Sequence, residues 1–351
     1  MKRLVPSLLG CFLMLSPARG LAQDTSLDVY GFFTFEWETD DVPGTSSTFD
    51  LHHFNVITQF RWGDRYRVFG EIEWEHGISL EAGGLGSGSV ALERAWFEYS
   101  NSDAFRVKVG RFITPFGLYN LRHDAAATYL FVFLPSSVYG KHDNTVGGTQ
   151  RLYAKFATGV QALGTVFVER WLGRYYAYVS NGRGPKPGEQ DNNENKGVGG
   201  RINLTAPEET FGVGISYYTD RNGNASDTRQ SSFGVDATFD YRLLHLEGEF
   251  FSPRLELVDI VGAPNGKFRD GIGYYLQGSY SFVGSIRPFA RYGSFNPDVD
   301  VGNDRETAVV LGLNVSLDPR VYLKTEVHFR SFQNPALSNQ KLYVASLAVA
   351  F

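Results

Sequence analysis

The stretch KLYVASLAVAF, from Lys341 to Phe351, alternates between two kinds of side chain. Successive side chains of a β-strand point to opposite faces, so the odd-numbered residues would share one face. These residues are the apolar or aromatic Tyr343, Ala345, Leu347, Val349 and Phe351. The residues on the other face are smaller and less apolar, and Ser346 is one of them. The stretch therefore predicts a strand with one continuous apolar face.

The same alternation recurs in SLDVYGFFTFEWE (26–38), RVFGEIEWEH (67–76) and VYLKTEVHFRSF (321–332). In the second segment, the apolar Val68, Ile72 and Trp74 oppose the charged Arg67, Glu71, Glu73 and Glu75. A face that carries several charges has to be in contact with water, because an unpaired buried charge is very costly. Each of these strands would therefore separate an aqueous environment from an apolar one.

Three features favour a membrane barrel over a soluble sandwich. Several strands are near ten residues long, which suits a tilted crossing of the bilayer. Aromatic residues make up 15% of the chain and often end the apolar faces, as interfacial girdles do. Tight turns such as WGDR and LDPR alternate with long polar loops such as NGRGPKPGEQDNNENKG. We therefore expect an all-β fold, a transmembrane antiparallel up-and-down β-barrel of about 16 strands, in which KLYVASLAVAF closes the barrel by pairing with the first strand.

The first residues have the layout of a secretory signal peptide. Lys2 and Arg3 precede a largely apolar run from Leu4 to Leu15, and Gly20-Leu21-Ala22 forms a small-residue cleavage site. We expect residues 1–22 to be a signal peptide and residues 23–351 to form one outer-membrane barrel domain. The chain would then be exported to the bacterial outer membrane.

Composition limits the classes of function. The single cysteine, Cys11, lies in the expected leader, so the exported protein would have no disulfide. Removing the three basic residues of the leader takes the formal net charge from −5 to −8. Nothing in this composition indicates nucleic-acid binding.

The segment from Thr114 to Thr145 is too long and too apolar for an ordinary surface loop. We expect it to fold into the barrel as a constriction loop. Its charged residues near the narrowest section would be Arg122, His123, Asp124, Lys141, His142 and Asp143. The two His-Asp pairs also allow a metal-binding or catalytic interpretation, but their spacing matches none of the usual site patterns. We expect no metal and no cofactor.

The stretch LERAWFEYSNSDAFRVKVGRFITPFGLYN resembles the phosphate-selective porin O and P family between Ala91 and Asn120. The resemblance implies a trimeric channel whose anion specificity comes from basic lumen residues. Arg106, Lys108 and Arg111 stand in the matching strand. The ending on Phe351 also resembles that of many outer-membrane barrels, in which Tyr343, Leu347, Val349 and Phe351 would form the signal read by the barrel assembly machinery.

Two departures from that family put phosphate selectivity in doubt. His52 and His53 stand where relatives tend to be rich in arginine, and Glu71, Glu73 and Glu75 place three acids on one wall. The strand alternation assigns both signs of charge to the lumen face. The basic set is Arg67, Arg94, Arg106, Lys108, Arg201, Arg287, Arg291, Lys324 and Arg330. The acidic set is Glu36, Glu71, Glu73, Glu98, Asp236, Asp240, Glu247, Glu249 and Glu326.

Opposed charges of this kind either tune which ions pass or only neutralise one another across the wall. The leading hypothesis is an outer-membrane porin for passive diffusion of small hydrophilic solutes or ions, with a preference for anions. Its partners would be outer-membrane lipid, lipopolysaccharide, the assembly machinery, the solutes and two further copies in a homotrimer. The alternative is a barrel lipid hydrolase that uses one of His53, His245 and His328, although the chain has no G-x-S-x-G motif.

Overall fold

The computed structural model describes residues 25–76, 88–122, 128–140, 142–144, 148–150, 153–182, 191, 193–222, 227–259, 261–282 and 284–351. The expected signal peptide, residues 1–22, lies outside these ranges. Among the residues described, none of the helical segments combines the length and hydropathy that crossing a lipid bilayer requires.

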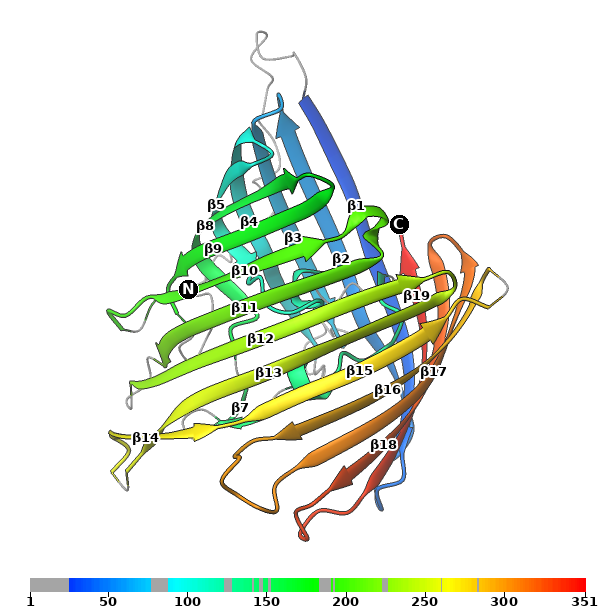
Figure 1. Cartoon of the computed structure of the whole chain (residues 1–351). Helices are drawn as coiled ribbons and strands as arrows, with labels where there is room; N and C mark the ends of the chain where they lie inside the picture. Colours follow the sequence, from blue (N-terminus) through cyan, green and yellow to red (C-terminus); the bar gives the residue numbers. More distant parts are fainter. Residues whose placement is uncertain are drawn as a thin grey trace, which may run out of the picture.

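The strands form one closed antiparallel barrel (Figure 1). Their bounds are β1 Thr25–Asp40, β2 Thr48–Trp62, β3 Tyr66–Glu75, β4 Ser89–Ser102, β5 Phe105–Ile113, β8 Phe156–Val168, β9 Trp171–Ser180, β10 Gly197–Thr205, β11 Phe211–Asn222, β12 Thr228–Tyr241, β13 Leu244–Val258, β14 Pro264–Asp270, β15 Ile272–Tyr280, β16 Ile286–Asn296, β17 Glu306–Asp318, β18 Val321–Phe332 and β19 Gln340–Ala350. Only Gly271 separates β14 from β15, and both pair with β13. They form one crossing, so the barrel has 16 strands, as expected.

The barrel closes between its first and last strands, which confirms the prediction for KLYVASLAVAF. The register of β1 and β19 runs from Phe32 opposite Ala350 to Asp40 opposite Leu342. Beyond that ladder, Gly31 and Phe351 exchange two backbone hydrogen bonds of 2.9 and 3.0 Å. With all neighbouring strands paired, the sheet has no open edge along this seam, as a lipid environment requires.

The alternation of side chains separates the outer and inner faces. Leu276 and Leu311 are examples of the outward residues and are more than half exposed, at 63% and 51%. Inward residues such as Glu36 and Glu71 are buried. The aromatic rings of Trp62 and Tyr66 stack at 5.1 Å beside the tight turn between β2 and β3. In outer-membrane barrels the end with the short turns is the periplasmic one, so this pair lies where an interfacial aromatic belt is expected.

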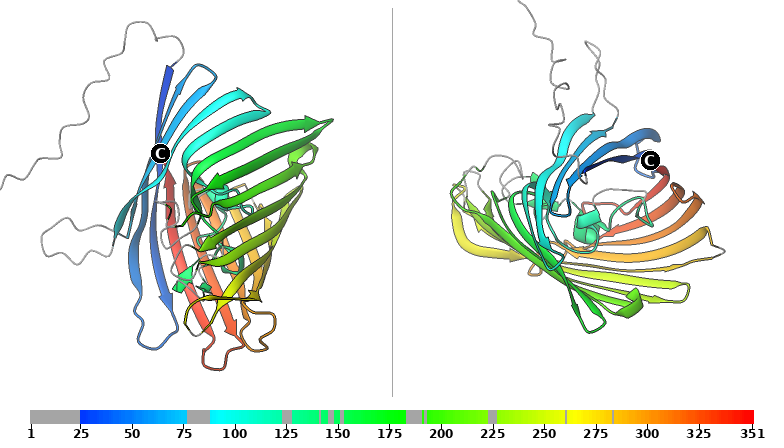
Figure 2. Two further views of the ribbon diagram at one scale, coloured as in Figure 1. Left: turned by 90° about the vertical axis from the view of Figure 1, so that its left-hand side faces the viewer. Right: turned by 90° about the horizontal axis from the view of Figure 1, so that it is seen from above.

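The interior of the barrel is occupied by the chain between β5 and β8 (Figure 2). This inward segment contains η1 (Asn120–Arg122), α1 (Ser136–Tyr139), β6 (His142–Asn144) and β7 (Gly148–Gln150). Phe131 and Tyr139 are almost fully buried and belong to the same apolar cluster as Phe251 and Phe289 of the wall. The largest apolar core of the described chain is therefore inside the barrel, between this loop and the wall.

Candidate functional site: the lumen and its inward loop

The inward loop is fixed where it leaves β5. The Thr114 hydroxyl donates to the carbonyl of Ala154, and the Asn120 side chain donates to the Thr114 carbonyl at 2.7 Å. Gly117 has a φ of 64°, and a Cβ there would approach Glu249 Oε2 to 2.3 Å. Glycine is therefore required at this turn, both for its backbone conformation and for its close approach to the far wall.

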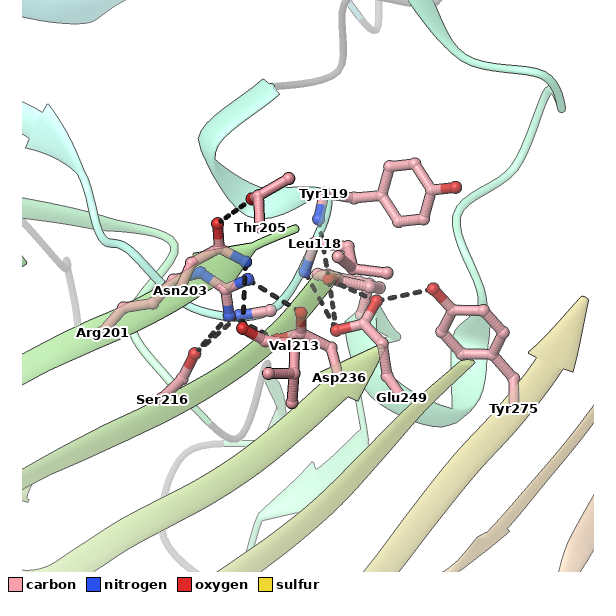
Figure 3. A network of polar contacts seen from close by, with 12 residues as sticks. Leu118, Tyr119, Arg201, Asn203, Thr205, Val213, Ser216, Asp236, Glu249 and Tyr275 are labelled. Carbon is pink, nitrogen blue, oxygen red and sulfur yellow. Dashed lines mark hydrogen bonds and ion pairs between the residues drawn. The ribbon is translucent and has the colours of Figure 1, made fainter. Parts of the chain in front are cut away.

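The first part of the loop is hydrogen-bonded to β11 and β13 on the far wall (Figure 3). Glu249 accepts from the Leu118 backbone N–H at 3.1 Å and from the hydroxyls of Tyr139 and Tyr275, each at 2.7 Å. The Gly117 N–H donates to Ser216 Oγ at 3.1 Å. Glu249 thus links the start of the loop, at Leu118, to α1, which contains Tyr139.

A buried ion pair lies beneath this contact. Arg201 of β10 donates to Asp236 of β12 through both terminal nitrogens, one of them at 2.8 Å. The same guanidinium donates to Ser216 Oγ at 2.9 Å. This network orients the hydroxyl that receives the Gly117 N–H (Figure 3).

The second part of the loop is bound by β17 and β18. Lys324 is almost fully buried, and its Nζ donates to the carbonyls of Tyr129 at 2.7 Å and Phe131 at 3.1 Å. Asn314 donates to the Leu130 carbonyl at 2.9 Å. Three successive carbonyls of the loop therefore accept hydrogen bonds from wall side chains. These bonds replace the hydrogen bonds to water that the carbonyls lose on burial.

Two more of the expected selectivity residues also bind the loop. Glu326 accepts from the Val132 backbone N–H, and Arg291 donates to the Phe133 carbonyl at 3.0 Å. Like Lys324, both point into the barrel, as expected. Each of them bonds both the loop backbone and a wall residue, since Glu326 lies 2.6 Å from His328 Nε2 and Arg291 donates to Gln277 at 3.3 Å.

A cluster of basic side chains lines the wall formed by β3, β4 and β5, and we call it the basic wall. Its members are Arg67, Arg94, Arg106 and Lys108. Glu98 accepts from Arg67 at 2.6 Å and also lies 4.0 Å from both Arg106 and Lys108. Arg94 pairs with Glu71. Within the described part of the chain, these four cations thus share two direct carboxylate partners, which leaves an excess of positive charge along these contacts.

Trp96 lies beneath part of this basic wall. The Lys108 ammonium lies 4.4 Å from the centroid of the Trp96 ring, and the Arg67 guanidinium lies 5.0 Å from it. Cation–π contacts at these distances are attractive. They hold the two basic groups against the wall without neutralising their charge.

The prediction that Arg111 lines the lumen with Arg106 and Lys108 is wrong. Arg111 is opposite Ala95 and Thr158 in the sheet, whereas Lys108 is opposite Glu98 and Gln161. Odd and even positions of one strand face opposite sides, so Arg111 lies on the other face of β5. Its guanidinium packs over Phe156 at 4.8 Å, and its Nε donates to the Glu93 carbonyl.

The other expected lumen residues face inward with varied partners. Asn55 donates to Glu71 at 3.0 Å and to Glu73 at 2.7 Å. Arg330 donates to Glu306 at 2.9 Å. Arg287 is exposed and lines a cavity beside Tyr129 and Asn314.

In the loop itself, the Arg122 guanidinium lies over the ring of Tyr119 at 5.3 Å. His123, Asp124 and Lys141 lie outside the described residues. For His142 and Asp143 only the backbone is described, paired in β6 with β7.

Sequence reasoning missed the roles of several residues that hold the loop. Glu247 and Glu249 were on the expected lumen face, but nothing in a single sequence shows which loop they meet. Tyr275 and Asn314 carried no signal, because a tyrosine or an asparagine on an inward strand position is ordinary. Only the path of the loop makes these four residues specific anchors.

Comparison with known proteins agrees with this architecture. The family model for Gram-negative porins matches residues 11–335. Similar solved structures include OmpF of Salmonella typhi in complex with daunomycin (14% identity, TM-score 0.63, covering 93% of this chain and 97% of that one). The loop-L8 deletion mutant of OmpT from Vibrio cholerae is similar as well (11% identity, TM-score 0.63, covering 93% and 99%). So is the channel DcaP of Acinetobacter baumannii (11% identity, TM-score 0.60, covering 93% and 97%).

No curated protein sequence matches the chain. The match to the family model extends over most of the chain, and the similar structures share the barrel fold. The chain belongs to the Gram-negative porin family, and it forms a β-barrel channel of the outer membrane.

Proposed function

We propose that this porin passes small hydrophilic solutes by diffusion and favours anions. The observation that carries the preference is the basic wall, where four cations share two direct carboxylate partners. Fixed cations along a confined pathway raise the local concentration of anions, and they are screened less there than on an open surface.

The acidic residues of the far wall support the same preference. Glu249 and Glu326 accept hydrogen bonds from the loop backbone, and Glu247 accepts from the Tyr119 hydroxyl and the Gln277 amide. Carboxylates that are covered and solvated by protein donors contribute less to the potential of the open pathway. The basic wall would then dominate the field that a permeating ion meets.

Reversal potentials in planar bilayers under a KCl gradient test this proposal. The triple substitution Arg67→Gln, Arg106→Gln and Lys108→Gln should move the reversal potential toward cation preference. Arg111→Gln is the matched control, because Arg111 is a neighbour on the same strand but on its other face. Equal reversal potentials in the wild type and the triple variant, or an equal shift in the control, would refute the role of the basic wall.

The finer resemblance to the phosphate-selective porin O and P family stays a prediction. The segment that carries it includes Arg106 and Lys108, both members of the basic wall. Phosphate would be bound by several converging donors, while the adjacent Glu98 would oppose it. Competition between phosphate and chloride in the same bilayer experiment would separate phosphate selectivity from a general anion preference.

The lipid hydrolase remains the second candidate because of one observation. His53 lies between a hydroxyl and a carboxylate, with Thr34 Oγ1 at 3.3 Å from Nδ1 and Glu75 at 3.6 Å from Nε2. Thr34, however, is fully buried, and its hydroxyl already accepts the His53 backbone N–H at 3.0 Å. In a lipid-ester hydrolysis assay, the wild type should therefore show no more turnover than His53→Ala.

We also propose that the porin assembles as a homotrimer within outer-membrane lipid and lipopolysaccharide. One of the similar structures is described as the trimer form of Vibrio cholerae OmpT. The mass of the detergent-solubilised protein, measured by sedimentation with the bound detergent subtracted, should correspond to three copies. A mass corresponding to one copy would refute the trimer.

A further inference from the structure

Three histidines gather at the extracellular ends of β2 and β3, and we call them the histidine cluster. Its members are His52, His53 and His76. The rings of His52 and His53 stack with centroids 4.0 Å apart, and those of His52 and His76 with centroids 5.0 Å apart. None of the described contacts that hold the inward loop involves the rings of these three histidines.

Two departures from regular strand geometry bring the three rings together. Thr34 is opposite His53 and Glu36 is opposite Asp50, so β2 has one extra residue here and forms a β-bulge. The bulge lets the consecutive residues His52 and His53 stack, although neighbours in a regular strand face opposite sides. His76, directly after β3, has a φ of 55°, which is uncommon for a residue other than glycine.

Carboxylates orient two of the rings through one nitrogen. Glu36 is 2.8 Å from His52 Nδ1, and Asp50 is 2.7 Å from His76 Nδ1. Among the described contacts, none involves Nε2 of either ring. This is the arrangement of histidines that ligate metals, in which a carboxylate binds one ring nitrogen and leaves the other for the ion.

The spacing of the candidate ligands suits one ion. His52, Glu75 and His76 each offer a ligand atom, and these atoms lie within 4.8 Å of one another. Two atoms that each lie about 2.1 Å from a zinc ion are at most about 4.2 Å apart. Small side-chain movements would therefore complete the site, and the side chains of His76 and Glu75 are partly exposed, which leaves room for these movements.

The chemistry of the ligands selects the class of ion. Imidazole nitrogens with a carboxylate suit Zn²⁺, Cu²⁺ and Ni²⁺, whereas Mg²⁺ and Ca²⁺ prefer oxygen ligands alone. A second group, His53, Glu73 and Glu75, shares Glu75 with the first. The negative charge of Glu75 and of its neighbours Glu36 and Asp50 favours a divalent cation at this place.

We propose that His52, His76 and Glu75 form a binding site for a divalent transition-metal ion on the lumen wall at the extracellular mouth. Glu36 and Asp50 are positioning residues that orient the two imidazoles. The bound ion adds two positive charges to the mouth of the channel. It therefore strengthens exclusion of cations while it is bound.

Calorimetric titration of the detergent-solubilised porin with ZnCl₂ at neutral pH tests the site. The wild type should bind Zn²⁺, and excess MgCl₂ should not displace it. His76→Gln should lower the affinity at least tenfold, and Asp50→Asn should lower it about 10- to 100-fold, as loss of an orienting partner does. His245→Gln is the matched control, because His245 also contacts two carboxylates, Asp240 and Glu247, but forms no candidate metal group with another of the described histidines.

Three results would overturn the proposal: no Zn²⁺ binding by the wild type, unchanged affinity in His76→Gln, or displacement by Mg²⁺. Heat-modifiable migration of each variant in gels verifies that its barrel has folded, and Asp50→Asn provides the test if His76→Gln does not fold. In bilayers, Zn²⁺ should move the reversal potential of the wild type, but not of a folded variant, toward anions, and a chelator should restore it. The absence of this shift would contradict the lumen position of the ion.

Discussion

At the scale of single residues, the face of a strand does not determine what a charged side chain does. Lys324 and Lys108 both point into the barrel, as alternation predicts. Lys324 donates to two carbonyls of the loop, whereas Lys108 lies over Trp96 beside Glu98. Alternation fixes only the direction of a side chain, while its partner depends on a loop whose path a single sequence does not reveal.

Lys324→Met should destabilise the porin, because it removes the donor to the carbonyls of Tyr129 and Phe131, of which the Tyr129 carbonyl keeps a contact of 3.4 Å with Asn314. A buried polar group left without a partner costs about 1–3 kcal/mol. Chemical unfolding of the refolded barrel should show a loss of at least this size. Arg287→Met is the control, since the exposed Arg287 lines a cavity at the loop without bonding to it among the described contacts.

If both variants unfold at the same denaturant concentration as the wild type, Lys324 does not hold the loop. If both variants are destabilised to the same extent, the cause would be the loss of a lumen cation in general. The loss of the specific hydrogen bonds to the loop would then not be the cause.

Phe351→Ala should impair assembly in cells more than it impairs the folded barrel. The ring of Phe351 stacks on Phe54 at 5.8 Å and lies over Gly31, where a Cβ would come within 2.7 Å of it. Such an aromatic pair contributes about 0.5–1.5 kcal/mol, and the alanine variant keeps the backbone bonds to Gly31. Outer-membrane yield in cells should therefore fall much further than the yield of refolding in micelles.

Phe329→Ala is the matched control, because Phe329 is an outward aromatic residue on the neighbouring strand with 39% exposure against 46% for Phe351. A loss in cells no larger than that of the control would show that Phe351 acts through packing alone and is not part of an assembly signal.

At the scale of elements, the inward loop shows how far sequence reasoning extends. Its length and its apolar residues predicted correctly that the segment from Thr114 enters the barrel, because so apolar a segment is not stable in water. The docking wall could not be predicted, because it depends on contacts between residues more than 100 positions apart, such as Leu118 with Glu249. The histidine cluster was hidden for a similar reason, since it requires a bulge in β2 and a positive φ at His76.

In the strand β5, by contrast, a rule that the sequence alone supplies predicts the faces of the side chains correctly. Its basic residues were grouped because they resemble one segment of a known family, and Arg111 was included with Arg106 and Lys108. Strict alternation alone separates the odd position from the two even ones, and the structure agrees with alternation. Where a resemblance and the period of a strand disagree about a face, the period is the stronger physical guide.

At the scale of the whole molecule, the barrel and the loop have different roles. Closure of 16 strands satisfies the backbone in lipid and leaves an interior wider than side chains of the wall alone fill. The loop packs an apolar core into part of that interior and leaves the basic wall on β3, β4 and β5. Under the proposed function, permeating ions would pass along the basic wall, on the side of the lumen where the loop is not docked.

The single-channel conductance of a loop deletion in planar bilayers tests this account most directly. Removing 121–137 deletes α1's first residues and the backbone that Lys324, Asn314, Glu326 and Arg291 bind, while every strand of the barrel remains. Because the narrowest section determines the resistance of a channel, the account predicts a conductance clearly above that of the wild type in the same KCl solution. A heat-modifiable, correctly inserted deletion variant with the conductance of the wild type would contradict it.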